Sequence, residues 1–360
     1  MYPRNGRTRK RTTLNSILGI VGLALLAFTC TVNANPPDED GNHNHGGGGG
    51  GGEVPPGTIY FTLSGQLHTM NGDGANKAPV PGDVHGEPSH ALHGDQRWYL
   101  EVRFIADEFY PDGGERRELF AVTEAGDAVQ LTDQADLEPV TSFTLGATRW
   151  APGDAFVSWV ALRWDPISGM PVDAGVYVAE VDYDAVSGNV IGLVAQPLDP
   201  MVPTAFVEDF DEVWRPLVRT HDWSPDQTAI VYDTVDSELF TADTFTGDSF
   251  VLTNTTGVGL PVWSPDGSKI AFQVPVASIA TINPDGSGEK IIIKRKGHSL
   301  AGASIPGWSP TGEHLIYRWH DSTTQGGFEP PDVYRAAANG GGKTNLTADL
   351  DGGATPIAWR

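Results

Sequence analysis

The sequence predicts an all-β fold of six four-stranded units, a six-bladed β-propeller. Three observations predict it. A tryptophan-turn-strand motif recurs along the chain, and the first and last units are incomplete in complementary ways. Pro or Gly also interrupts nearly every window in which a helix of about 12 residues would form.

The recurring motif is a tryptophan followed by a tight turn and an apolar strand. It is clearest at Trp263 (WSPDGSKIAF) and recurs at Trp223 (WSPDQTAIVY) and Trp308 (WSPTGEHLIY). Weaker copies begin at Trp150 (WAPGDAFVSW) and at Ala91 (ALHGDQRWYL), where the tryptophan is lost. Pro fixes φ and Gly accepts a positive φ, so each copy predicts a β-hairpin. The copies lie 40 to 73 residues apart, about one propeller blade with insertions in the early copies.

The two ends of the repeat region complete each other. The last copy, PIAW, contains only a first strand and stops at Trp359, whereas residues 58–80 contain the later strands of a unit that lacks a first one. Pairing of the N- and C-terminal strands would close the ring and bury two sheet edges. Counting first positions at 91, 150, 223, 263, 308 and 359 gives six blades, and the propeller is predicted to span residues 58–360.

The N-terminal region carries a targeting signal and a tether. A basic start precedes an apolar run over residues 17–28, which is too short for a membrane span, and small residues lead to Ala34. We therefore predict a signal peptide over 1–34, cleaved after Ala34, and a Gly-rich flexible linker over 35–57. Because the chain is predicted to carry a signal peptide, we expect the mature chain to be periplasmic or secreted. The alternatives are a retained anchor and a lipid-anchored form at the cell envelope, which would use Cys30.

Charge and cysteine content limit the classes of partner. The net charge of -23 repels phosphate backbones, so nucleic-acid binding is not expected. The single cysteine lies within the predicted signal peptide, so no disulfide is expected in the mature chain. The mature chain is also predicted to have no transmembrane span and to be a monomer.

The repeat resembles that of the TolB-like propellers, whose units carry a Trp-Ser-Pro-Asp-Gly turn followed by an apolar strand. The resemblance is strong at Trp223, Trp263 and Trp308 and covers roughly residues 58–360. TolB is a periplasmic component that binds partner proteins in an envelope complex, so the resemblance implies export and protein interaction. The chain departs from TolB before the propeller, because the Gly-rich tether stands in place of an N-terminal α/β domain.

Candidate site residues follow from position within the repeat. The residue before each motif position should face the central channel, and in the first three copies it is His90, Arg149 and Asp222. His221 lies one place upstream, although side-chain alternation along a strand prevents His221 and Asp222 from pointing the same way. These four residues predict a polar arc at one mouth of the channel. Their alternative role is to hydrogen-bond exposed strand ends.

Two further candidates are tryptophans outside the motif. Trp164 and Trp214 lie in or beside two insertions, 163–175 and 196–219, where binding surfaces often form. They could stack on a sugar ring or pack beneath a loop.

The sequence favours a non-catalytic binding or scaffolding propeller that mediates protein or glycan interactions. It contains no GxSxG nucleophile elbow, and no catalytic residues are assigned. The partner is expected to be an envelope or extracellular protein, and no cofactor is expected. The alternative is a metal-dependent polysaccharide lyase or hydrolase at the channel mouth, since two His and one Asp would suit Zn²⁺ or Mn²⁺.

Overall fold

The structure is a computed structural model that describes residues 54–106, 115–133, 142–165, 170–208, 214–275, 277–294, 302–320 and 330–360. These residues belong to one compact unit, Gly52–Arg360. The predicted signal peptide and nearly all of the linker lie outside the described residues, so both stay predictions.

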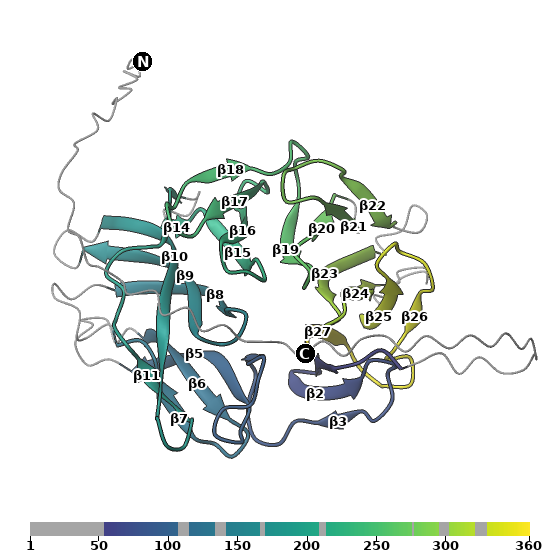
Figure 1. Cartoon of the computed structure of the whole chain (residues 1–360), viewed down its shortest axis with the longest axis horizontal. Helices are drawn as coiled ribbons and strands as arrows, with labels where there is room; N and C mark the ends of the chain where they lie inside the picture. Colours follow the sequence, from purple (N-terminus) through teal and green to yellow (C-terminus); the bar gives the residue numbers. More distant parts are fainter. Residues whose placement is uncertain are drawn as a thin grey trace, which may run out of the picture. The chain divides into compact units, whose positions relative to one another are not determined.

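Six antiparallel sheets form a ring, and the described residues contain no helix (Figure 1). Blade 1 joins the two ends of the chain, and its strands from the centre outward are β27 (Ala354–Trp359), β1 (Thr58–Leu63), β2 (Gln66–Asn71) and β3 (Ala78–Pro79). Blade 2 consists of β4 (Glu87–Pro88), β5 (Trp98–Ala106), β6 (Glu115–Thr123) and β7 (Ala128–Gln130). Blade 3 consists of β8 (Ser142–Trp150), β9 (Phe156–Asp165), β10 (Met170–Tyr183) and β11 (Val190–Leu193).

The second half of the ring is more regular. Blade 4 consists of β15 (Val218–Trp223), β16 (Ala229–Thr234), β17 (Leu239–Asp243) and β18 (Ser249–Val251). Blade 5 consists of β19 (Gly259–Trp263), β20 (Ile270–Val274), β21 (Ser278–Ile282) and β22 (Lys290–Ile293). Blade 6 consists of β23 (Gly302–Trp308), β24 (His314–His320), β25 (Asp332–Ala337) and β26 (Thr344–Asn345).

The two predicted insertions, 163–175 and 196–219, contain strands. Residues 163–165 and 170–175 lengthen the hairpin of β9 and β10. Between blades 3 and 4 in the chain, β12 (Val202–Thr204) pairs with β10, and β13 (Phe206–Glu208) pairs with β14 (Trp214–Pro216).

Pairing of the chain ends closes the ring, as predicted. β27 pairs antiparallel with β1, so that Ile59 lies opposite Trp359. Beyond the strands, Arg360 N donates to Thr58 O at 2.9 Å, and Thr58 N donates to Arg360 O at 2.5 Å. The all-β, six-bladed architecture is confirmed, and no described helix has the length and apolar character needed to cross a bilayer.

Six apolar clusters hold the ring together, one between each pair of adjacent blades. Five of them contain a motif tryptophan, and each of these side chains is at most 9% exposed: Trp150, Trp223, Trp263, Trp308 and Trp359. The cluster between blades 1 and 2 has none and uses Tyr60 and Tyr99, packed edge to face. The motif tryptophans are therefore buried between the blades.

Candidate functional site

In blades 4 and 5 the inner strand ends in a turn that the motif residues stabilise. In blade 5, Ser264 Oγ donates to Asp266 Oδ1 at 2.6 Å and accepts from Lys269 N at 2.9 Å. Gly267 has a φ of 72°, where an L side chain is strained. Blade 4 repeats the Ser224–Asp226 hydrogen bond at 2.7 Å. The turn thus fixes the end of the inner strand and places the motif proline at the rim of the central channel.

The indole N–H groups tie neighbouring blades together around this channel. Trp150 Nε1 donates to Glu87 O and Trp308 Nε1 donates to Val262 O, each at 3.2 Å, and in both pairs the acceptor lies on the preceding blade. Trp263 Nε1 is buried and has no hydrogen-bond partner among the described residues.

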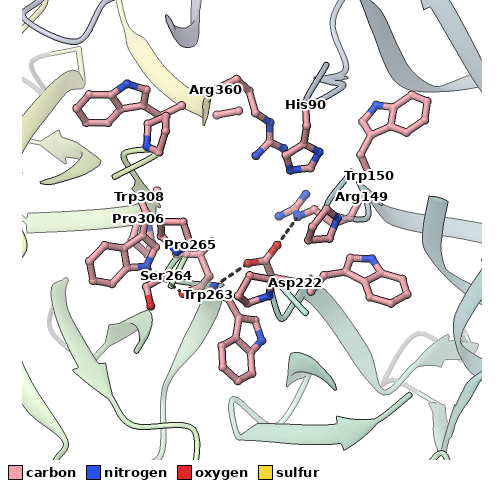
Figure 2. Close-up of a pocket in the computed structure, with 18 of the residues that line it drawn as sticks. His90, Arg149, Trp150, Asp222, Trp263, Ser264, Pro265, Pro306, Trp308 and Arg360 are labelled. Atoms are coloured by element: carbon pink, nitrogen blue, oxygen red, sulfur yellow. Dashed lines mark hydrogen bonds and ion pairs between the residues drawn. The ribbon is translucent and has the colours of Figure 1, made fainter. Parts of the chain in front are cut away.

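A pocket of about 450 Å³ opens at the centre of the ring (Figure 2). Every blade contributes to it, because its walls come from the six inner strands and the turns that follow them. One side is apolar, and its walls include Leu260, Pro261, Val262, Pro306, Gly307, Ile357 and Ala358. The other side is charged, and its lining includes Glu87, His90, Arg149, Asp222 and Arg360.

The four acidic and basic residues of the charged side are incompletely paired. Arg360 Nη2 lies 2.5 Å from Glu87 Oε1. Arg149 lies 3.9 Å from Glu87 Oε2 and 3.9 Å from Asp222 Oδ1, which is beyond hydrogen-bond reach. Among the described residues, Arg149 donates one hydrogen bond, to the carbonyl of its neighbour Thr148, and Glu87 Oε2 has no partner. Donors and acceptors therefore remain available on this wall.

Asp222 is held against this wall in a poorly solvated position. Its Oδ2 accepts from Trp263 N at 2.7 Å, and 23% of its side chain is exposed. Burial raises the pKa of Asp222 to about 6, although Arg149 acts in the opposite direction. The carboxyl therefore titrates in the mildly acidic range.

His90 is oriented by a buried carboxylate of the next blade. Its Nδ1 lies 2.8 Å from Asp154 Oδ1, and its backbone N donates to the same oxygen at 2.8 Å. Asp154 Oδ2 accepts from Ala91 N at 2.8 Å and lies 3.0 Å from His93 Nε2. Since Asp154 engages Nδ1, the Nε2 atom of His90 is left as the group that can bind a ligand.

The structure brings together three of the four predicted arc residues. His90, Arg149 and Asp222 all line the pocket, and position within the repeat correctly located Arg149 and Asp222. His221 does not line it, and this part of the arc is corrected. Its side chain is fully buried, with Nε2 2.7 Å from Ser158 Oγ, because it points to the opposite face of β15 from Asp222.

Burial also determines the protonation of His221. Burial and the nearby Arg149 lower the pKa of His221 to about 3, so the ring is neutral at pH 7. Trp223 Nε1 donates to the same Ser158 hydroxyl at 2.8 Å. Because Ser158 and His221 are both inaccessible, this Ser–His pair is a structural contact between blades 3 and 4 rather than a nucleophile and its base.

The motif position in blade 2 is Pro88, and the predicted Ala91 is wrong by three residues. In the complete copies the motif tryptophan pairs with the residue seven places later, as Trp223 does with Ile230. In blade 2, Pro88 pairs with Tyr99, eleven places later, so the turn has four extra residues. The hydrogen bond from Ser89 N to Trp98 O, at 2.7 Å, corresponds to the bond from Ser264 N to Lys269 O in blade 5. His90 reaches the pocket from this longer turn and not from the inner strand.

Two residues of the charged wall were not predicted. Glu87 was missed because the register of blade 2 was misplaced, and Arg360 because it follows the last motif position.

The two candidate tryptophans outside the motif, Trp164 and Trp214, lie in β9 and β14. Their side chains lie outside the described residues, so a binding role for them stays a prediction.

The ligand set of the metal-dependent alternative is not assembled. His221 is separated from the pocket, and no group of three or more His, Cys, Asp or Glu side chains among the described residues could hold a metal ion. His90 Nδ1 is engaged by Asp154.

Comparisons with known proteins add likenesses in fold. No family model and no curated protein matches the sequence. A protein assigned as TolB from Agrobacterium tumefaciens is 18% identical, with 82% of this chain and 89% of that chain covered and a TM-score of 0.44. An oligogalacturonate lyase from Vibrio parahaemolyticus is 15% identical, with coverages of 80% and 72% and a TM-score of 0.41. An oligogalacturonate lyase in complex with manganese is 14% identical, with coverages of 81% and 72% and a TM-score of 0.41. Likenesses at this level assign no activity, ligand or partner to this chain.

Proposed function

We propose that this chain is an exported binding propeller that holds a segment of a partner protein in its central pocket. The observation that carries the proposal is the incompletely paired wall of that pocket. Arg149 lies between two carboxylates without hydrogen-bonding either, and Glu87 Oε2 is buried without a hydrogen-bond partner among the described residues. A ligand that supplied the missing partners would offset their desolvation.

The lining indicates the chemistry of the segment. Arg149 and Arg360 balance Glu87 and Asp222, so the wall presents both donors and acceptors without a strong net charge. The opposite wall supplies proline, valine and isoleucine surfaces. A polypeptide segment of mixed polarity fits both walls, since its backbone and polar side chains can bond to one while an apolar side chain packs on the other.

Binding is favoured over catalysis for a specific reason. The hydrogen-bonded pair Ser158 and His221 is inaccessible, and no group of three or more His, Cys, Asp or Glu side chains among the described residues could hold a metal ion. A glycan is less well supported than a protein segment, because the motif indoles are buried between blades and so are not free platforms for sugar rings.

The proposed location rests on the sequence alone. The basic start and short apolar run of residues 1–34 support export to the periplasm or beyond the cell. A propeller on a glycine-rich tether would then meet envelope or extracellular proteins.

A site-specific photo-crosslinker tests the proposal in the full chain, expressed in its own cells. Ile357 lines the pocket and is 38% exposed, so a benzoylphenylalanine at this position should form a covalent adduct with a protein. The same group at Val186, which is 96% exposed between β10 and β11, is the matched control. The adduct should disappear when Arg149→Ala is added. An Ile357 adduct that survives Arg149→Ala, or that also forms from Val186, would refute a pocket-bound segment.

A further inference from the structure

The six outer strands of the propeller differ in how their exposed edges are protected. Natural proteins protect such edges with lysine, proline, bulges or short polar strands, because an unpaired strand accepts another chain. β3 contains Pro79 and follows Lys77, and the two-residue β26 follows Lys343. β22 begins at Lys290 and is followed by Lys294, and its pairing is interrupted by a bulge.

The remaining outer strands are β7, β11 and β18, and they differ in the protection of their edges. β7 carries no large apolar residue that is exposed. β11 exposes Ile191, but a bulge disrupts its pairing, and the Gln196 side chain just beyond it donates to Leu131 O next to blade 2. Among the six outer strands, β18 alone combines exposed large apolar side chains with regular pairing and no lysine or proline.

The apolar surface of β18 is unusually exposed. All three of its residues are exposed, with Phe250 at 64% and Val251 at 58%. Phe245, in the turn that leads into the strand, is 96% exposed. Hydrogen bonds from Phe245 N and Thr246 N to Asp243 Oδ1, each 2.8 Å, hold this turn in place. The phenylalanine is therefore presented by an ordered turn.

The backbone of β18 also faces outward at defined residues. Asp248 O accepts from Asp243 N, and Leu252 N donates to Leu239 O, so the polar groups of residues 248 and 252 point toward β17. Since these groups alternate along an antiparallel strand, the N–H and C=O of Ser249 and Val251 point away from the blade. An added strand would find two donors and two acceptors there.

The charge around this edge is negative. Residues 218–258 contain seven acids and one arginine, Arg219, which is paired with Asp233 at 2.6 Å. Asp243 and Asp248 precede β18, and Asp236 and Glu238 lie at the far end of its hairpin. Blade 5 is balanced by comparison, because residues 259–294 contain three acids and three lysines.

We infer that the outer edge of β18 is a second interaction surface, which binds a basic, extended segment of a partner protein by strand addition. Its backbone groups pair with the segment, the exposed phenylalanines pack on alternate apolar side chains, and the flanking acids attract lysine or arginine. A second copy of this chain is disfavoured, because it would bring the same acids together. This surface is separate from the central pocket and does not depend on the function proposed for it.

Two synthetic peptides test the inference on the full chain. A fluorescent Lys-Val-Lys-Phe-Lys-Val-Lys peptide should bind with a Kd below about 1 mM, measured by fluorescence anisotropy, while the Glu-Val-Glu-Phe-Glu-Val-Glu peptide should not. Hydrogen exchange at the amides of Ser249 and Val251 should slow when the basic peptide is present. Failure of the basic peptide to bind, or equal binding of both, would overturn the inference.

Variants locate the bound peptide. Phe250→Ser removes the apolar contact, and Val251→Pro removes an outward N–H while leaving the inward hydrogen bonds intact; each should weaken binding at least tenfold. Ile291→Ser on β22, at an exposed position of the neighbouring blade, is the matched control and should change binding less than twofold. Unchanged binding in the β18 variants would refute the location. A wild-type dimer that Phe250→Ser converts to a monomer would assign the edge to a second copy and contradict the proposed occupant.

Discussion

Replacing Asp154 by Gly should lower the free energy of unfolding by about 3 kcal/mol. The Asp154 carboxylate is fully buried and links blade 3 to blade 2 through His90, Ala91 and His93. A hydrogen bond to a charged group contributes about 1.5–3 kcal/mol. The two imidazoles are 20–30% exposed and can turn to water, so the estimate counts only the two backbone N–H bonds, at the lower end of that range.

The backbone makes glycine the appropriate replacement. Asp154 has a φ of 61°, and the corresponding turn residues of blades 5 and 6, Gly267 and Gly312, are glycines with φ of 72° and 73°. The substitution therefore removes the carboxylate without straining the turn. Gln227→Gly in blade 4 is the matched control, because Gln227 has a φ of 61° and donates a single hydrogen bond to Pro152 O at 2.6 Å. That variant should lose about 1 kcal/mol.

Urea unfolding followed by tryptophan fluorescence measures both variants, and pH supplies a second test. Burial alone would raise the pKa of Asp154, but the hydrogen bonds from His90 and His93 outweigh it and lower the pKa from 3.8 to about 2. This lowering of the pKa contributes about 2 kcal/mol to the free energy of unfolding. The contribution is fully present above about pH 4 and is lost as the pH falls toward 2. The gap between wild type and Asp154→Gly should shrink by that amount over this interval. A loss at pH 7 equal to that of Gln227→Gly, or a gap that does not change with pH, would refute the reasoning.

Three further predictions concern the channel and the N-terminus. Trp308→Phe should destabilise the chain by about 1 kcal/mol more than Trp263→Phe in urea unfolding, because the Trp308 indole N–H has a hydrogen-bond partner and that of Trp263 has none among the described residues. Equal losses would contradict this. Asp222→Asn should raise the stability at pH 7 by about 1–2 kcal/mol, because burial raises the pKa of the carboxyl to about 6 and so disfavours its charged form. The gain should vanish below about pH 4, and thermal melts at both pH values measure it. A variant less stable than the wild type at pH 7 would contradict the prediction. Mass spectrometry of the exported protein should find an N-terminus after Ala34, whereas a lipid on Cys30 would replace that assignment.

The fold could be predicted because its signals are local and repeated. A tryptophan, a tight turn and an apolar strand specify one hairpin, and burial of Trp223 or Trp263 between blades follows from the same ten residues. Ring closure was predictable because an isolated β27 and an incomplete blade 1 each leave an unpaired edge.

The site was only partly predictable, because it depends on register. A shift of three residues misplaced the inner strand of blade 2 and concealed Glu87, and sequence spacing alone could not show that the turn after Pro88 is four residues longer. Asp154 was missed for a related reason. Its motif reads Pro-Gly-Asp in place of Pro-Asp-Gly, and nothing local indicates that its carboxylate reaches His90 on another blade.

The distribution of charge around the pocket is better explained by binding than by stability. At equivalent inner positions, blades 5 and 6 have Val262 and Gly307, which close the ring without buried charge. Blades 3 and 4 have Arg149 and Asp222, whose 3.9 Å separation gives no hydrogen bond, and burial raises the pKa of the Asp222 carboxyl. Such a pair contributes less to stability than apolar residues of similar size would. If Asp222→Asn stabilises the ring and also abolishes the adduct formed from position 357, the Asp222 carboxylate contributes to binding of the segment and lowers the stability of the fold. If it stabilises the ring and the adduct persists, the charged wall has no part in binding the segment.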